Sequence, residues 1–154
     1  MTAVLIGVDI VSADRLSRAA ARGGATFARH LTTLAERDRG LGAATFPVKE
    51  SFIKAVGGRP PGFSWHDFEA APEPPSPWAG ELLDEAAAEL TAATGLALTA
   101  GAAYVLRGAC REAARLRLAG GRGQVAGAAR WGSGAGLLVS LAVVYADRKD
   151  TRCP

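Results

Sequence analysis

Short runs of apolar and β-branched residues stand at both ends of the chain and at two places between them. The first, AVLIGVDIV at residues 3–11, and the last, LLVSLAVVYAD at residues 137–147, have the length and composition of buried strands. FSWHDFEA at residues 63–70 alternates large apolar with polar residues, and LALTAGAAYVL at residues 96–106 fits a strand with a turn. The hydrophobic pattern therefore predicts four strands.

Between these strands, apolar residues recur at helical spacing. Ser12 or Asp14 can cap the first helix, and Gly23-Gly24 ends it. Thr33 stands three residues before a glutamate and indicates a capped turn in the second helical piece. The stretch 119–136 is too rich in glycine to predict a regular element. The predicted helical segments are residues 14–24, 26–40, 44–56, 78–95 and 108–118.

Strands near both ends with helices between them predict an α+β fold whose terminal strands share one sheet. A length of 154 residues suits a single domain over residues 1–154. A hydrophobic content of 49% with 21% charged residues is typical of a folded globule. We find no signal peptide and no apolar run long enough to cross a bilayer. We therefore expect a soluble, cytoplasmic protein with no membrane partner.

The net charge of +3 is too small to identify a partner by itself, because an acidic protein, a phosphorylated small molecule and nucleic acid all remain open. The absence of an aromatic-basic motif argues against nucleic acid. Arg15, Arg18 and Arg22 share one face of the first predicted helix. That face is either simply solvated or a docking ridge for an acidic partner helix.

The segment FPVKESFIKAVGG, residues 46–58, carries the clearest candidate chemistry. Lys49 and Glu50 are adjacent, and Lys54 follows on the same predicted helix. A plain amphipathic helix explains the pattern if all three charges face solvent. A functional site explains it if another element brings a second carboxylate to the helix.

Asp9 is the candidate for that second carboxylate, because it lies at the end of a buried strand. A lone buried carboxylate is costly and needs a partner. An ion pair with Arg15 or Arg29 is one solution. The other is a metal site with Glu50, since two carboxylates and few further ligands suit Mg²⁺, which keeps its waters and takes phosphate oxygens. The two lysines would then meet phosphate charge, which is an outline for phosphoryl transfer.

Four motifs, GVDIV, FARHLT, KESFIKAVGG and SWHDFE, occur in the order and spacing of 4′-phosphopantetheinyl transferases. The chain resembles most the short holo-acyl-carrier-protein synthase group, although KESFIKA resembles the longer surfactin-type enzymes equally well. Position 11 is Val, where the longer class has a further acidic metal ligand, and this favours the short group. The resemblance covers residues 4–69 well and residues 103–147 loosely.

The resemblance implies a 4′-phosphopantetheinyl transferase-like fold, with a small antiparallel sheet and helices packed on it. It also implies an enzyme that moves the 4′-phosphopantetheine arm of coenzyme A to a serine of an acyl or peptidyl carrier protein, in fatty-acid or polyketide and secondary-metabolite biosynthesis. Asp9 and Glu50 would hold Mg²⁺. Glu50, directly or through a metal-bound water, would help to deprotonate the serine. Lys49 and Lys54 would contact the phosphates, with Lys54 also catalytic. The resemblance further implies a homotrimer with each active site between two subunits.

The C-terminal half diverges from the family pattern. The family carries a Ser-His pair before the last strand, and the corresponding GAARWGSGAGLL has no histidine. Arg130 for charge and Trp131 for stacking, with Ser133, are candidates to replace the coenzyme contact, although Trp131 could simply pack under the last strand. A segment at about residues 72–100 adds a helix that the compact family form lacks. The second hypothesis is therefore a repurposed scaffold that no longer binds coenzyme A and acts as a small-molecule biosynthetic enzyme or a carrier-protein-binding module.

Overall fold

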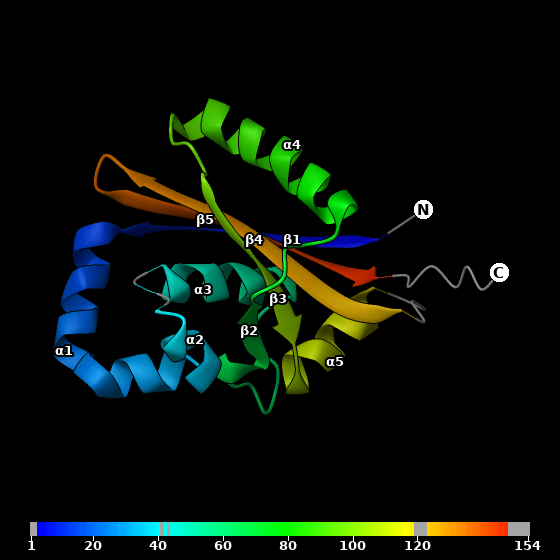
Figure 1. Cartoon of the computed structure of the whole chain (residues 1–154), viewed down its shortest axis with the longest axis horizontal. Coiled ribbons are helices and arrows are strands. Elements are labelled where there is room, and N and C mark those ends of the chain that lie inside the picture. Colours follow the sequence, from blue (N-terminus) through cyan, green and yellow to red (C-terminus); the bar gives the residue numbers. More distant parts are fainter. Residues whose placement is uncertain (1–2, 41, 43, 119–122, 148–154) are drawn as a thin grey trace.

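One antiparallel sheet runs through the molecule, and helices cover both of its faces (Figure 1). The computed structural model describes residues 3–40, 42, 44–118 and 123–147. The strands are β1 (Val4–Ser12), β2 (Phe68–Ala71), β3 (Ala100–Leu106), β4 (Gln124–Gly134) and β5 (Leu137–Asp147). The helices are α1 (Ala13–Leu31), α2 (Leu34–Asp38), α3 (Thr45–Ala55), the 3₁₀ helix η1 (Trp65–Asp67), α4 (Pro77–Thr94) and α5 (Gly108–Arg117).

The strand order is β1-β5-β4-β3-β2, with every neighbouring pair antiparallel. The two terminal strands pair from Val4 opposite Tyr145 to Ser12 opposite Leu137. This confirms the predicted α+β class and the shared sheet of the terminal strands. Among the described residues, no helix combines the length and apolar character needed to span a bilayer.

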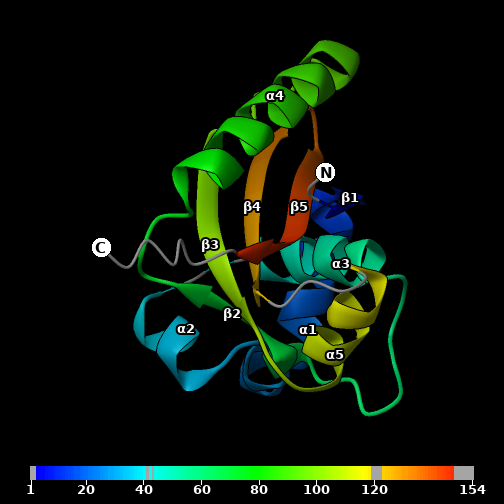
Figure 2. The ribbon, with the colours of Figure 1, turned by 90° about the vertical axis from the view of Figure 1, so that its right-hand side faces the viewer.

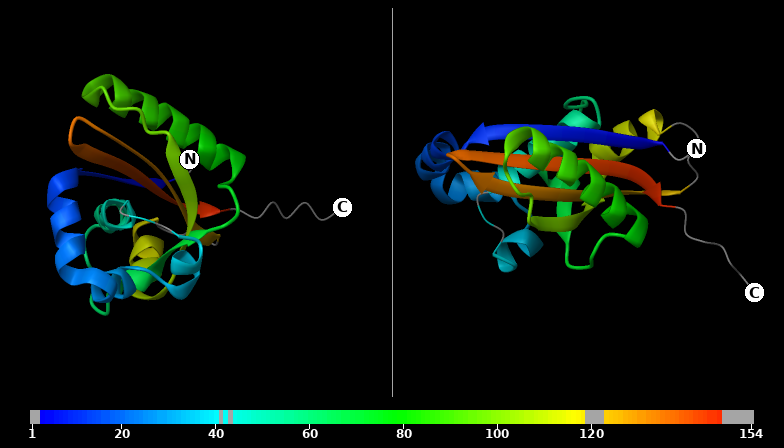
Figure 3. Two further views of the ribbon diagram at one scale, coloured as in Figure 1. Left: turned by 60° about the vertical axis from the view of Figure 1, so that its left-hand side comes forward. Right: turned by 90° about the horizontal axis from the view of Figure 1, so that it is seen from above.

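Two hydrophobic cores lie on opposite faces of the sheet, because successive strand residues point to opposite sides. Helix α4 lies alone over one face, where Leu83 packs with Val139 and Val143 (Figures 2 and 3). The remaining helices lie on the other side, where Phe52 of α3 packs with Phe68 and Tyr104. The candidate site residues on β1 and α3 belong to this second face.

The sequence analysis predicted no regular element in the glycine-rich stretch, and this prediction is wrong, because residues 124–134 form strand β4. Its glycines are required by close packing. A Cβ on Gly127 would lie 2.6 Å from the ring of Phe52, and one on Gly132 would lie 1.9 Å from the carbonyl oxygen of Ala97. The small residues therefore let helices and loops approach the sheet, and glycine here marks close contact within a strand.

The N-terminal helices also differ from the prediction. Helix α1 does not end at Gly23-Gly24 but continues to Leu31 across a kink, at which Gly24 adopts φ 52° and ψ −137°. The capped turn at Thr33 is confirmed: its amide donates to the Glu36 carboxylate at 2.9 Å, and the Glu36 amide donates to the Thr33 hydroxyl at 3.3 Å. The predicted strand at 63–70 is a 3₁₀ turn followed by β2.

Candidate active site

Strand β1 crosses helix α3 with their backbones in direct contact. A Cβ on Gly7 would lie 2.0 Å from the carbonyl oxygen of Ser51 and 2.6 Å from the amide nitrogen of Ala55. Only glycine allows this approach. Asp9 lies two residues further along β1, so its side chain points to the same face and meets α3.

Two carboxylates stand beside this contact, and each has a cation as its partner. The ammonium of Lys54 donates to the Asp9 carboxylate at 2.7 Å, and the guanidinium of Arg59 donates to the Glu50 carboxylate at 3.0 Å. The acids are largely covered, with 13% and 20% of their side chains exposed, whereas both cations are about half exposed. Because Glu50 and Lys54 are one helical turn apart, Asp9 and Glu50 lie along the same face of α3.

The two carboxylates fit a magnesium ion that retains other ligands. Asp9 and Glu50 are hard oxygen donors from two elements, and Mg²⁺ commonly takes one or two carboxylates together with waters and phosphate oxygens. Across the described residues there is no cluster of three or more His, Cys, Asp or Glu side chains suited to a metal ion. The donor set is therefore an open one. The structure pairs Asp9 with Lys54 and not with Arg15 or Arg29, the alternative that the sequence left open.

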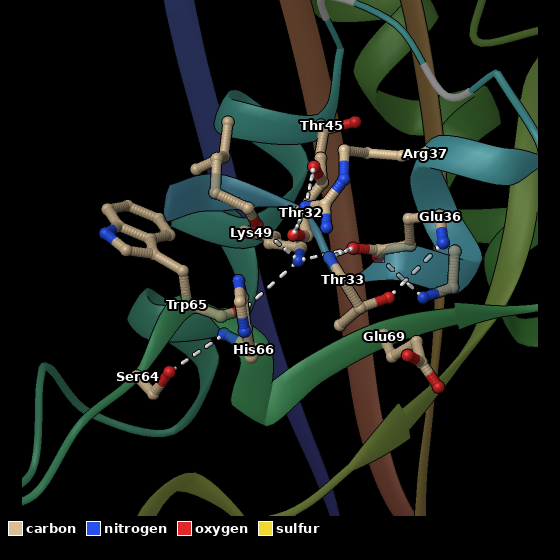
Figure 4. Close-up of polar contacts among 12 residues, drawn as sticks. Thr32, Thr33, Glu36, Arg37, Thr45, Lys49, Ser64, Trp65, His66 and Glu69 are labelled. Atoms are coloured by element: carbon tan, nitrogen blue, oxygen red, sulfur yellow. Dashed lines mark hydrogen bonds and ion pairs between the residues drawn. The ribbon is translucent and has the colours of Figure 1, made fainter. Parts of the chain in front are cut away.

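Lys49 has a different position from Lys54, although both belong to α3. Its side chain is fully buried and donates to the Glu36 carboxylate at 2.9 Å and to the carbonyl oxygens of Leu31 and Trp65 at 2.7 and 3.1 Å (Figure 4). The Glu36 carboxylate is fully buried too and also accepts from the amide of Ala70 at 2.9 Å. One buried ion pair thus joins α1, α2, α3, η1 and β2.

This arrangement does not agree with the predicted phosphate contact of Lys49. Its ammonium donors are used by oxygens of the protein, and no part of the side chain reaches the surface. Burial lowers the pKa of Lys49, while the hydrogen bond and charge of Glu36 act in the opposite direction. Lys49 therefore joins the elements around Glu50, and its ammonium is not accessible to a bound phosphate.

Arg130 and Trp131 lie on opposite faces of the sheet, because they are consecutive residues of β4. Trp131 is in register with Ser140, which is opposite Asp9, so these three side chains share the α3 face. Arg130 points to the α4 face and forms an ion pair of 2.6 Å with Asp84 of α4. Within one chain, Arg130 and Trp131 therefore do not face the same side of the sheet, and their roles as replacements for the coenzyme contact stay separate predictions.

Trp131 borders a cavity of about 420 Å³ between the start of α3, the segment before β3 and the end of β4. Thr99 and Ser133 contribute the polar side chains of its described wall, and the other lining residues are apolar or glycine. Trp131 also packs against the core on the α3 face, as the alternative reading expected. It therefore both supports the sheet and lines a cavity whose described wall residues carry no charge.

The three arginines of α1 face solvent. Arg15, Arg18 and Arg22 are all exposed on the helix that follows directly from β1. Helix α1 stands at the side of the molecule and packs mainly at its two ends, through Leu16 and Leu31 (Figure 3). The basic face is therefore accessible and begins a few residues after Asp9.

The sequence analysis missed three residues that shape the site: Gly7, Glu36 and Arg59. Gly7 could have been predicted, since a glycine within a strand of β-branched residues often marks a close approach of another backbone. Glu36 was recognised only as a cap, because its pairing with Lys49 depends on how α2 docks. Arg59 lies in the loop after α3, whose pattern gives no indication of a partner.

Comparisons with known proteins give the family and the fold. No family model matches the sequence. The chain is 42% identical over 84 residues to the holo-[acyl-carrier-protein] synthase of Salinispora arenicola, across 49% of this chain and 67% of that protein. The chain belongs to the holo-acyl-carrier-protein synthase family. The synthase of Leifsonia xyli is 46% identical over 68 residues, across 42% of this chain and 54% of that protein.

Solved structures of holo-acyl-carrier-protein synthases share the fold over most of the chain. The holo-ACP-synthase of Plasmodium yoelii has a TM-score of 0.59 with 12% identity, over 96% of this chain and 99% of that one. The Helicobacter pylori holo-[acyl-carrier-protein] synthase in complex with coenzyme A has a TM-score of 0.56 with 18% identity, over 93% and 100%. The sequence matches span about half to two thirds of the curated synthases and less than half of this chain, whereas the fold likeness extends over 96% of this chain.

Proposed function

We propose that this chain transfers the 4′-phosphopantetheine arm of coenzyme A to a serine hydroxyl of an acyl or peptidyl carrier protein, and that it depends on Mg²⁺. The observation that carries the proposal is the contact between β1 and α3, which puts Asp9, Glu50 and Lys54 along one face of α3. Membership of the holo-acyl-carrier-protein synthase family supports the same reaction.

The proposed chemistry assigns separate tasks to the three charged groups. Asp9 and Glu50 hold Mg²⁺, which supplies positive charge to the pyrophosphate when it is bound. Glu50 also accepts the proton of the serine hydroxyl in this proposal. The serine oxygen forms a bond to the phosphorus of the phosphopantetheine, the pyrophosphate bond breaks, and 3′,5′-adenosine diphosphate leaves. Lys54, half exposed beside Asp9, contacts the phosphate oxygens.

Carrier-protein docking is assigned to the exposed basic face of α1. Arg15, Arg18 and Arg22 are accessible and follow directly after the strand that carries Asp9. An acidic partner docked there would have its serine near the carboxylates. Charges at the rim of an interface act mainly on encounter rate and specificity.

We also propose a homotrimer that works in the cytoplasm, in fatty-acid or polyketide and secondary-metabolite biosynthesis. Ile6 and Ile10 of the edge strand β1 support association with further copies, because these two apolar residues are 52% and 54% exposed. They point to the α4 face of the sheet, on the side that α4 leaves open. Sedimentation equilibrium of the full chain tests this assembly: a single monomeric species at micromolar concentration contradicts it.

A second candidate function is supported by the cavity at Trp131. Its described wall has no charged side chain, and Arg130 faces the other side of the sheet. Such a cavity suits a neutral small molecule better than a nucleotide phosphate, which fits a repurposed scaffold that has lost coenzyme A. Calorimetric titration with coenzyme A and Mg²⁺ separates the two. Binding that Trp131→Ala weakens supports the transferase, whereas no binding to the wild-type chain supports the repurposed scaffold.

The transfer itself is tested by intact mass. The full chain is incubated with Mg²⁺, coenzyme A and a panel of apo carrier proteins, with parallel samples that contain a chelator. We expect the mass of one phosphopantetheine to be added to at least one carrier, and no addition in the chelated sample. A panel that stays entirely unmodified contradicts the proposal.

A further inference from the structure

The side chain of Arg59 is held beside Asp9 and Glu50 by contacts on more than one side. It follows the turn at Gly57 and Gly58, whose φ angles of 94° and 116° suit glycine. Its guanidinium donates to Glu50 at 3.0 Å and lies over the rings of Phe63 and Trp65, with 5.3 and 5.0 Å to their centroids. The side chain is therefore held from one side by charge and from the other by aromatic faces.

Arg59 is paired with Glu50 in the same way that Lys54 is paired with Asp9. Each of the two carboxylates has one cation, Lys54 for Asp9 and Arg59 for Glu50, and the exposed fractions of the two cations are 52% and 54%. A divalent ion on the two carboxylates would compete with both cations. Both cations have the solvent exposure to turn to another anion nearby.

We propose that Arg59 is the counter-ion of Glu50 before the metal binds, and a phosphate-binding cation afterwards. This inference rests on the proposed function, because the anion is the pyrophosphate group of coenzyme A. Glu50 uses only one side of the guanidinium, which presents several N–H donors in a planar fork. That fork matches phosphate oxygens in a way that the point charge of a lysine does not.

Removing Arg59 should change two affinities in opposite directions. Without the competing cation, Glu50 binds Mg²⁺ more tightly. Without the fork, the chain binds coenzyme A more weakly. A residue that only supports the fold does not produce this split, because a structural defect weakens both affinities together.

Arg107 offers a closely matched control. Its guanidinium pairs with Glu69 at 2.8 Å, and the exposed fractions of 53% and 20% nearly equal the 54% and 20% of Arg59 and Glu50. The Arg107 pair joins β2 to the start of α5, away from Asp9 and Glu50. Ion pairs exposed to this degree contribute little to stability, so we expect both alanine variants to fold.

The experiment is calorimetric titration of the full chain, first with Mg²⁺ alone and then with coenzyme A at saturating Mg²⁺. In Arg59→Ala we expect Mg²⁺ binding to tighten a few-fold and coenzyme A binding to weaken by roughly ten- to a hundredfold, the scale of one hydrogen-bonded charge. Arg59→Lys should keep the wild-type affinity for Mg²⁺ and lose part of the affinity for coenzyme A. Arg107→Ala should change neither constant.

The outcomes separate the inference from the proposed function. Wild-type binding of both ligands with unchanged constants in Arg59→Ala and Arg59→Lys overturns the role of Arg59 and leaves the transferase proposal standing. A parallel loss of both affinities in a folded Arg59→Ala variant also overturns it, in favour of a structural role. A wild-type chain that binds neither Mg²⁺ nor coenzyme A overturns the proposed function, and the inference with it.

Discussion

Replacing Lys49 by methionine removes the cation of the buried ion pair and leaves the rest of its surroundings in place. The Glu36 carboxylate, fully buried, keeps only the amides of Thr33 and Ala70 as donors. The carbonyl oxygens of Leu31 and Trp65 lose a donor as well. Breaking a buried pair in this way costs about 3–5 kcal/mol. This is a large part of the free energy of unfolding of a typical domain, which is about 5–15 kcal/mol.

Urea unfolding measures this cost, and Lys54→Met is its control on the same helix. Lys54 makes an ion pair of 2.7 Å with Asp9, but 52% of its side chain is exposed, so its loss should change the free energy of unfolding by less than about 1 kcal/mol. In the double variant Lys49→Met with Glu36→Gln, the unpaired charge is gone. We expect that variant to be more stable than Lys49→Met alone, which shows that the two residues are coupled.

The same variants separate a structural Lys49 from one that contacts phosphate. If Lys49 acts through the fold, the folded fraction of Lys49→Met binds coenzyme A with nearly wild-type affinity. A Lys49→Met variant that loses coenzyme A binding while its free energy of unfolding changes by no more than that of Lys54→Met refutes the reasoning.

Three further predictions concern other parts of the site and fold. Gly7→Ala should destabilise the chain by about 1–3 kcal/mol in urea and weaken Mg²⁺ binding, because the added Cβ meets the backbone of α3; unchanged values contradict the close contact. Arg18→Glu with Arg22→Glu should raise the KM for an acidic carrier protein far more than that for coenzyme A, with wild-type transfer weakening as salt rises; an unchanged carrier KM at low salt removes α1 from the docking surface. The Thr33 side chain, and then Arg107, lower the pKa of Glu69 below 4.5, so its contribution to stability is present above pH 4.5 and is lost as pH falls through the lowered value. Below pH 4.5, the free energy of unfolding should therefore fall less steeply with pH in Arg107→Ala than in the wild-type chain. The same dependence on pH in both chains contradicts this linkage.

The fold could be predicted where local pattern determines structure. The terminal strands, helix α3 and the capped turn at Thr33 followed from periodicity and capping chemistry. Strand β4 did not, because its glycines indicate a loop by composition and are explained only by the helix and loop that approach them. At Gly23-Gly24 the sequence indicated the position of the break, but not that α1 continues beyond the kink to Leu31.

The site could be predicted only to the extent that residues share a helix face. Glu50 and Lys54 are one turn apart, and the structure puts them beside Asp9. Lys49 and Lys54 are five residues apart, which turns them about 140° from each other around the helix. The helical spacing therefore predicts that the two lysines differ in burial. It does not predict the partner of Lys49, because Glu36 lies on α2 and meets Lys49 only in the folded chain. Arg130 and Trp131 were grouped by adjacency, although strand alternation separates them.

The central claim is that Asp9 and Glu50, brought to one face of α3, carry Mg²⁺-dependent transfer. Intact-mass measurement of an apo carrier protein, incubated with coenzyme A, Mg²⁺ and the wild-type, Asp9→Ala or Glu50→Ala chain, tests it most directly. Thermal melts of the three chains run in parallel. The account predicts that the wild-type chain adds the phosphopantetheine mass and that both variants stay folded and add none. Full transfer by folded Asp9→Ala and Glu50→Ala chains contradicts it.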